Sequence, residues 1–209
     1  MKETRTSHLA LLVLVAIVFG WSGWRPYDRF TWWLEIAPVL GGIALLLATY
    51  RRFEFTTLCY GLMALHLCVL CVGGHYTYAR VPTFDWLRDL FGWERNHYDR
   101  LGHFMQGFVP AIVAREIFVR LDIVKRTTWR PFLIVAVCLA ISAFYELTEW
   151  WAALFSGEAA NDFLGSQGDP WDTQADMLIA SIGAAFALLL LSRFHDRALR
   201  KIERAQNIP

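Results

Sequence analysis

The chain has 209 residues, of which 56% are hydrophobic and 19% are charged, and its formal net charge is +1. A soluble domain carries about a quarter charged residues, so this composition favours a membrane protein. The small net charge excludes a global positive field that would attract nucleic acid, and no nucleic-acid partner is expected.

Six mostly apolar stretches of about 20 residues are long enough to cross a bilayer as α-helices. They occupy residues 8–24, 32–50, 55–75, 98–119, 131–155 and 171–194. An amphipathic helix at residues 82–92 is expected to lie on the membrane surface. The sequence therefore predicts an all-α, polytopic membrane protein with about six transmembrane helices in a single membrane domain, residues 1–209.

Basic residues are concentrated at one set of helix ends. That set comprises Lys2, Arg5, Arg51, Arg52, Arg120, Lys125, Arg126, Arg130, Arg193, Arg197, Arg200, Lys201 and Arg204. Because cytoplasmic flanks carry the excess of Lys and Arg, both termini are expected in the cytoplasm, with the protein in the bacterial inner membrane. Nine of the ten tryptophans fall at or beyond the opposite, outer helix ends: Trp21, Trp24, Trp32, Trp33, Trp86, Trp93, Trp150, Trp151 and Trp171.

Polar residues meet near the outer interface where the third stretch ends and the fourth begins. His75 and Tyr78 end the third stretch. In the fourth, Asp99 and His103 are four residues apart and Gln106 lies three further on. These three residues therefore share one helix face.

The fifth and sixth stretches bring acids to the same depth. Glu146 and Glu149 lie three residues apart at the end of the fifth stretch. Asp172 and Asp176 lie four residues apart at the beginning of the sixth. Each pair shares a helix face, so the predicted topology gathers the acids into one outer cluster.

The acids of this outer cluster outnumber the nearby cations, which are Arg100, His75 and His103. Carboxylates near hydrocarbon need partners, and a divalent cation would balance them. Histidine with carboxylates suits Zn²⁺, Mn²⁺ or Fe²⁺. The candidate metal ligands are His103, Glu149, Asp176 and Asp99. The candidate acid–base groups are Glu146, Glu149 and Asp176. The further polar residues of the outer face are His75, Tyr78, Arg100, Gln106 and Asp172.

Structural alternatives accompany each assignment. Asp169 and Asp172 fit a helix cap, Asp99 suits the positive end of its helix, and intramembrane polar groups also hold helices together. Near the inner end of the fourth stretch, Arg115 and Glu116 are adjacent and point in different directions, and they are predicted to snorkel and to form ion pairs at the interface. The four cysteines all lie in apolar runs and are expected to be inert core residues.

Three segments resemble the YjdF family of bacterial inner-membrane proteins. They are R-N-x-Y-D-R-L-G-H-F-x-Q-G at residues 95–107, E-x-x-E-W at 146–150 and F-L-G-x-Q-G-D-x-W-D-T-Q-x-D-M at 163–177. Length and helix count agree over the whole chain. That family is a domain of unknown function, so the resemblance implies location and fold and no activity. The last third also looks like the VanZ-like membrane proteins, over two helices only, and this transfers no role.

The sequence favours an outward-facing acidic and histidine site that binds a divalent metal and acts on a membrane lipid or another amphiphile. One alternative is a proton- or cation-coupled transporter, in which the carboxylates form a relay and His66 is a step along it. Another is a non-catalytic assembly or structural subunit. The residues by themselves do not decide whether the protein is an enzyme.

Overall fold

The computed structural model describes residues 2–156, 161–164 and 166–206, in which all regular secondary structure is helical. Its helices are α1 (Lys2–Ser22), α2 (Arg29–Thr49), α3 (Thr57–Tyr76), α4 (Pro82–Phe91), α5 (Tyr98–Arg120), α6 (Arg130–Ser156), α7 (Asn161–Leu164) and α8 (Asp172–Gln206). The predicted all-α class is confirmed. Of the polar loop expected between the last two spans, residues 157–160 and 165 lie outside the described residues.

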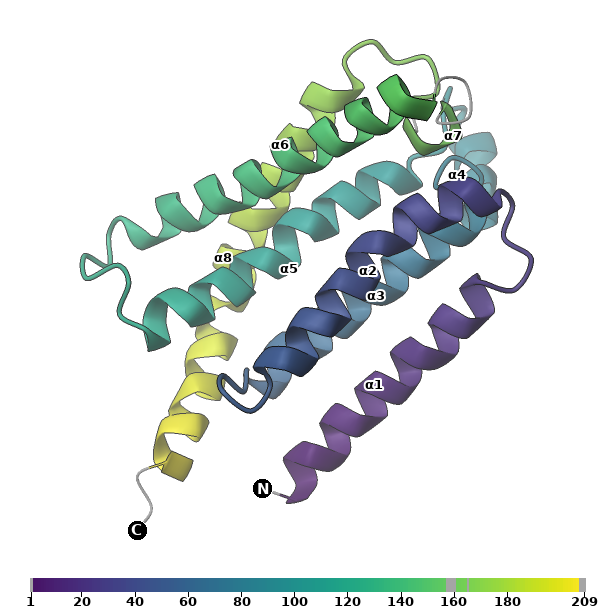
Figure 1. The fold of residues 1–209 in the computed structure, drawn as a ribbon. Helices are drawn as coiled ribbons and strands as arrows, with labels where there is room; N and C mark the ends of the chain where they lie inside the picture. Colours follow the sequence, from purple (N-terminus) through teal and green to yellow (C-terminus); the bar gives the residue numbers. More distant parts are fainter. Residues whose placement is uncertain (1, 157–160, 165, 207–209) are drawn as a thin grey trace.

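Five helices are long and apolar enough to cross a membrane, namely α1, α2, α3, α6 and α8. The expected sixth span, α5, is not among them, because polar residues within the helix, among them His103, Gln106, Arg115 and Glu116, lower its mean hydropathy. It lies within the bundle all the same, against α8, α6 and α3 (Figure 1).

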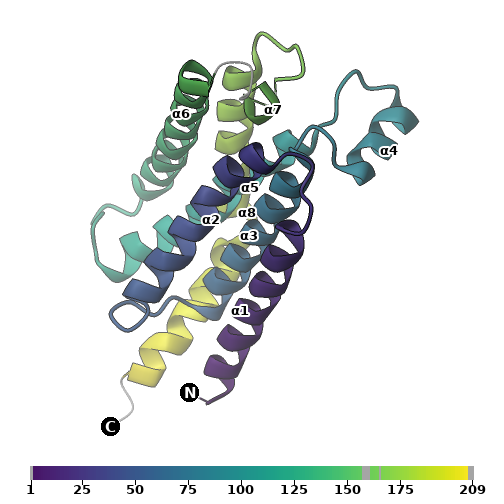
Figure 2. The same ribbon diagram turned by 45° about the vertical axis from the view of Figure 1, so that its right-hand side comes forward.

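Both chain termini lie at the same end of the bundle, here called the termini end (Figures 1 and 2). At the opposite end, here called the site end, α3 and α6 finish and α5 and α8 begin. The short helix α4 projects sideways there (Figure 2). The stretch predicted to end at residue 194 continues as one helix to Gln206, because neither Gly nor Pro interrupts the chain between these positions.

The α5–α8 contact is the most extensive between helices and depends on two glycines. A Cβ atom added at Gly107 would overlap the backbone carbonyl of Ala180, and one added at Gly183 would overlap the carbonyl of Phe104. Small residues allow membrane helices to approach this closely. The approach matters because α5 and α8 carry most of the charged residues described below.

We predict that Gly183→Ala and Gly107→Ala lower the stability of the folded protein by about 1–3 kcal/mol, since overpacking forces the two backbones apart. Gly41→Ala is the matched control, because nothing lies within 4 Å of a Cβ at that position of α2. Thermal unfolding in mild detergent measures the difference. Equal melting temperatures for the three variants would contradict the close α5–α8 contact.

Candidate functional site

The first turns of α5, the last turns of α6 and the first turns of α8 bring five titratable side chains together at the site end. They are Asp99, His103, Glu146, Glu149 and Asp176, each no more than 9% exposed. Asp99, His103 and Asp176 offer ligand atoms within 4.8 Å of one another, and so do His103, Glu146 and Glu149. His103 belongs to both groups and is the centre of this acidic cluster.

One ring nitrogen of His103 faces the carboxylates, and the other contacts an amide. His103 Nδ1 lies 3.2 Å from Gln106 Oε1. An amide oxygen only accepts, so Nδ1 carries a proton and donates it. Nε2 lies 3.5 Å from Asp99 Oδ1, 3.7 Å from Glu146 Oε1 and 3.9 Å from Asp176 Oδ1.

A lone pair on Nε2 facing three carboxylate oxygens would be repelled, so Nε2 either carries a proton, which makes the ring an imidazolium, or faces a cation. The separations exceed the roughly 2.7–2.9 Å of a charge-assisted hydrogen bond. They are closer to the edges of a metal polyhedron, which measure about 3.3 Å for tetrahedral ligands bonded at ~2.0–2.1 Å. Glu146 Oε1 is buried and has no hydrogen-bond partner among the described residues. A divalent cation therefore fits these donors.

Two arginines neutralise the other side of the acidic cluster. Arg100 pairs with Asp169 at 3.0 Å, Asp172 at 2.7 Å and Asp176 at 2.5 Å. Arg95 pairs with Asp172 at 2.6 Å and lies 3.7 Å from Asp99. Asp172 thus accepts from both guanidinium groups, which leaves Asp99, Glu146 and Glu149 with less positive charge close by.

The outer-face residues predicted from sequence differ in whether they reach the acidic cluster. Gln106 and Arg100 contact the acidic cluster directly, at His103 and Asp176, and Asp172 is joined to it through Arg100. His75 does not reach it, because its Nδ1 lies 2.9 Å from the Ser22 carbonyl and its ring stacks on Trp21. It joins α3 to the end of α1.

Asp169, predicted to cap the last helix, accepts the Trp171 N–H at 2.9 Å in the turn before α8, which begins at Asp172. The carboxylate of Asp172, also considered a cap, is instead held by ion pairs with Arg95 and Arg100.

Sequence reasoning missed one acid beside the acidic cluster. Glu35 of α2 is buried and accepts a 3.1 Å hydrogen bond from Tyr145 Oη. Tyr78, which was predicted at this face, lies against Gly73 and Gly102 with its backbone at a positive φ of 52°. Burial, followed by the charge of Glu35, raises the pKa of Tyr78 well above its usual range. A lone acid within the apolar stretch 32–50 was the signal that could have identified Glu35.

A cavity of about 230 Å³ borders the acidic cluster on the α6 and α8 side. Its lining includes Glu146, Glu149, Trp150, Asp172 and Thr173. Two of the candidate acid–base groups therefore face a space that a small polar group can enter.

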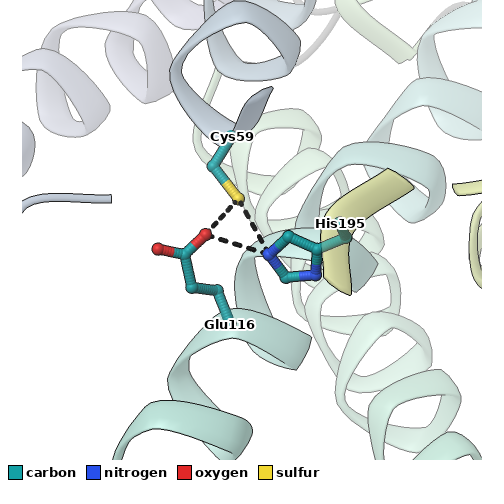
Figure 3. Close-up of side chains that lie close together, drawn as sticks. All are labelled: Cys59, Glu116 and His195. Atoms are coloured by element: carbon teal, nitrogen blue, oxygen red, sulfur yellow. Dashed lines mark hydrogen bonds and ion pairs between the residues drawn. The ribbon is translucent and has the colours of Figure 1, made fainter. Parts of the chain in front are cut away.

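A second buried cluster lies toward the termini end, where Cys59 of α3, Glu116 of α5 and His195 of α8 converge (Figure 3). All three side chains are fully buried. Cys59 Sγ and His195 Nε2 each lie 3.0 Å from Glu116 Oε2. As in the acidic cluster, its ligand atoms lie within 4.8 Å of one another.

Hydrogen bonding distinguishes this trio from a metal site. Arg115 Nη1 lies 2.9 Å from His195 Nδ1 and can only donate, so Nδ1 accepts and the proton is on Nε2. Glu116 receives five donor atoms, from Thr56 N and Oγ1, Cys59 Sγ, His195 Nε2 and Arg120 Nη1. A carboxylate offers about four lone-pair sites, so Glu116 is saturated. The trio is a structural junction of three helices.

This junction corrects the expectation that Glu116 lies at the interface, whereas Arg115 forms an ion pair as expected. Arg115 pairs with Asp196 at 2.6 Å, and Glu116 points into the protein and is fully buried. The two residues are adjacent in α5 and face different neighbours. Sequence analysis missed His195 because it lies in the basic tail, and no local pattern links it to residue 116.

Comparison with known proteins gives one family. The family model described as "Predicted membrane protein (DUF2238)" matches residues 7–197. The chain is 50% identical over 187 residues to the inner membrane protein YjdF of Escherichia coli strain K12, and the match covers 90% of each chain. No solved structure matches the chain.

Proposed function

The chain belongs to the DUF2238 family of predicted membrane proteins, and on that premise we propose that this inner-membrane protein binds a divalent cation in the acidic cluster and acts on the polar head of an amphiphile. The observation that carries the proposal is the orientation of His103. Its Nδ1 donates to Gln106, which leaves Nε2 free to ligate among three carboxylates. Histidine ligands commonly donate their second N–H in this way, which fixes the tautomer.

The donor set indicates which ions fit. One imidazole with several carboxylates suits Zn²⁺, Mn²⁺ or Fe²⁺, and His103, Asp99 and Asp176 would hold the ion with Glu146 or Glu149. A cation there supplies Lewis-acid polarisation of a phosphoryl or carbonyl oxygen and a more acidic bound water. Whichever glutamate is not a ligand is placed to move a proton for a substrate in the neighbouring cavity.

The surroundings of the acidic cluster favour an amphiphilic substrate. The cavity of about 230 Å³ is too small for a whole lipid and has room for a head group. Eight tryptophans near the site end have exposed side chains, namely Trp21, Trp24, Trp33, Trp86, Trp93, Trp150, Trp151 and Trp171. Such rings lie at the level of lipid head groups. The acidic cluster is therefore at the depth where a lipid presents its polar part.

Transport is a weaker alternative. A relay needs polar groups that continue across the bundle, but the buried positions of α5 between His103 and Glu116 are Met105, Gly107, Val109, Ala111, Ile112 and Ala114. About 20 Å of helix, at 1.5 Å per residue, separates the two clusters. A purely structural role for the acidic cluster is also less favoured. Its carboxylates lack a full set of hydrogen-bond donors, whereas Glu116 has a full set.

The proposal includes an orientation. With α5 counted, six helices cross the membrane, and the termini end, with its basic residues, faces the cytoplasm. The acidic cluster then opens toward the periplasm.

The metal prediction compares the two clusters by making the same change, histidine to glutamine, in each. His103→Gln should reduce the metal that copurifies with the protein in mild detergent to background, because a neutral amide is a poor ligand for these ions. His195→Gln should keep the metal and lower the melting temperature, because it disturbs only the Glu116 junction. Elemental analysis and thermal unfolding of both variants provide the measurements. Metal absent from the wild type, or equally lost from both variants, refutes the metal site.

A separate prediction concerns the reaction. Wild-type protein in liposomes of bacterial lipid extract, supplied with Mn²⁺ or Zn²⁺, should convert a lipid species detectable by mass spectrometry. Glu149→Gln and Glu146→Gln should slow this conversion about a hundredfold or more, the usual effect of losing a general acid or base.

Glu94→Gln is the control for these variants, because Glu94 is exposed in the loop before α5 and lies outside the acidic cluster. A lipid profile that the wild type leaves unchanged would argue against the enzymatic part of the proposal and leave the metal test unaffected.

The orientation predicts the compartment of reporter fusions. A fusion at Arg126, between α5 and α6, and one at the C-terminus should read cytoplasmic, and one placed in residues 166–168 should read periplasmic. Alkaline phosphatase and green fluorescent protein activities measure the two compartments. A periplasmic C-terminus would exclude six spans with a cytoplasmic N-terminus.

A further inference from the structure

A long apolar groove lies on the bundle between α1, α2 and α3, which stand next to one another in Figure 1. Its volume is about 530 Å³, within the ~300–1,000 Å³ range of ligand pockets. The lining residues from α1 are Arg5, His8, Leu9, Leu11, Leu12 and Val15, most of them three or four positions apart along one helix face. Ile43, Leu46 and Leu47 of α2 and Met63, Ala64 and Leu67 of α3 complete the apolar walls.

The groove has the length of one lipid leaflet. From Arg5 to Val15, α1 rises about 15 Å at 1.5 Å per residue. The hydrocarbon core of a bilayer is about 30 Å thick, so one leaflet measures about half of that. The groove therefore runs from the membrane surface at the termini end to the middle of the bilayer.

The mouth of the groove is cationic. Arg5 and Arg51 line it, both are exposed, and neither forms an ion pair within the part of the chain that the structure describes. Beneath them, His8 lies 3.0 Å from Tyr50 Oη and 4.4 Å, between ring centroids, from Tyr60. Polar groups thus occupy the end near the membrane surface, and apolar side chains occupy the rest.

We propose that this groove binds one anionic phospholipid, with an acyl chain along α1–α3 and its phosphate between Arg5 and Arg51. The ligand matches the groove in length, in apolar character and in the sign of charge at the mouth. Basic pockets between membrane helices recognise anionic head groups in this way. This binding site lies at the opposite end of the bundle from the acidic cluster and does not depend on the proposed function.

The test uses full-length protein in dodecyl maltoside titrated with dioleoyl phosphatidylglycerol or with dioleoyl phosphatidylcholine, with bound lipid counted by native mass spectrometry. Phosphatidylglycerol should bind more tightly. Arg51→Gln should weaken it about fivefold, the equivalent of about 1 kcal/mol for each basic residue near an anionic surface. Arg52→Gln is the matched control, because it removes the same charge from the next residue, which does not line the groove.

Two outcomes would overturn the proposal. Equal weakening by Arg51→Gln and Arg52→Gln would show attraction to the basic surface as a whole and not to the groove. Equal binding of the two lipids would show that the head group is not recognised.

A second pair of variants tests the apolar part and needs no change of charge. Leu12→Trp should fill the groove and reduce phosphatidylglycerol binding at least as much as Arg51→Gln does. Leu14→Trp should leave binding unchanged, because Leu14 is exposed to a similar extent on the same helix but lies outside the lining. If Leu12→Trp binds the lipid as the wild type does, the acyl chain does not occupy this groove.

Discussion

Carboxylates buried among apolar helices require a positive partner or a full set of hydrogen-bond donors, and the two ends of α5 differ in how far they meet this requirement. At one end, Glu116 is surrounded by five donor atoms and needs nothing further. At the other end, Arg95 and Arg100 are occupied mainly with Asp169, Asp172 and Asp176. Asp99, Glu146 and Glu149 then surround the single imidazole of His103. One imidazole is not enough to partner three carboxylates.

The two histidines show how one chemical group can serve opposite purposes. His103 donates from Nδ1 to an amide oxygen and presents Nε2 to carboxylates. His195 accepts at Nδ1 from a guanidinium and donates from Nε2 to Glu116. Each cluster places a buried histidine beside at least one buried carboxylate. The neighbour on the far side of each ring decides which nitrogen is free, and hence whether an ion can bind.

Close packing of α5 against α8 makes both clusters possible. Gly107 and Gly183 bring the two backbones together at a level between the clusters, so residues of α8 reach α5 at both ends. The two ends of the bundle also offer different surfaces, with exposed tryptophans around the site end and exposed arginines at the termini end. This asymmetry suits a protein that handles a head group at one face and holds a lipid at the other.

The sequence alone determined the helical class and most of the apolar stretches, because hydropathy and helix length are local properties. It also placed Asp99, His103 and Gln106 on one face, since a helical period of 3.6 residues fixes which side chains align. The helix order then brought Glu146, Glu149 and Asp176 to the same depth.

Only the tertiary structure decided which helices are neighbours. It added Glu35 and Arg95 beside the acidic cluster, turned His75 toward α1, and joined Cys59, Glu116 and His195 across as many as 136 positions of the chain. No periodicity records such pairings, because helix packing depends on surface shape and on close approach at small residues. The protonation of each histidine follows from those pairings, which is why the difference between an ion site and a structural junction cannot be derived from sequence.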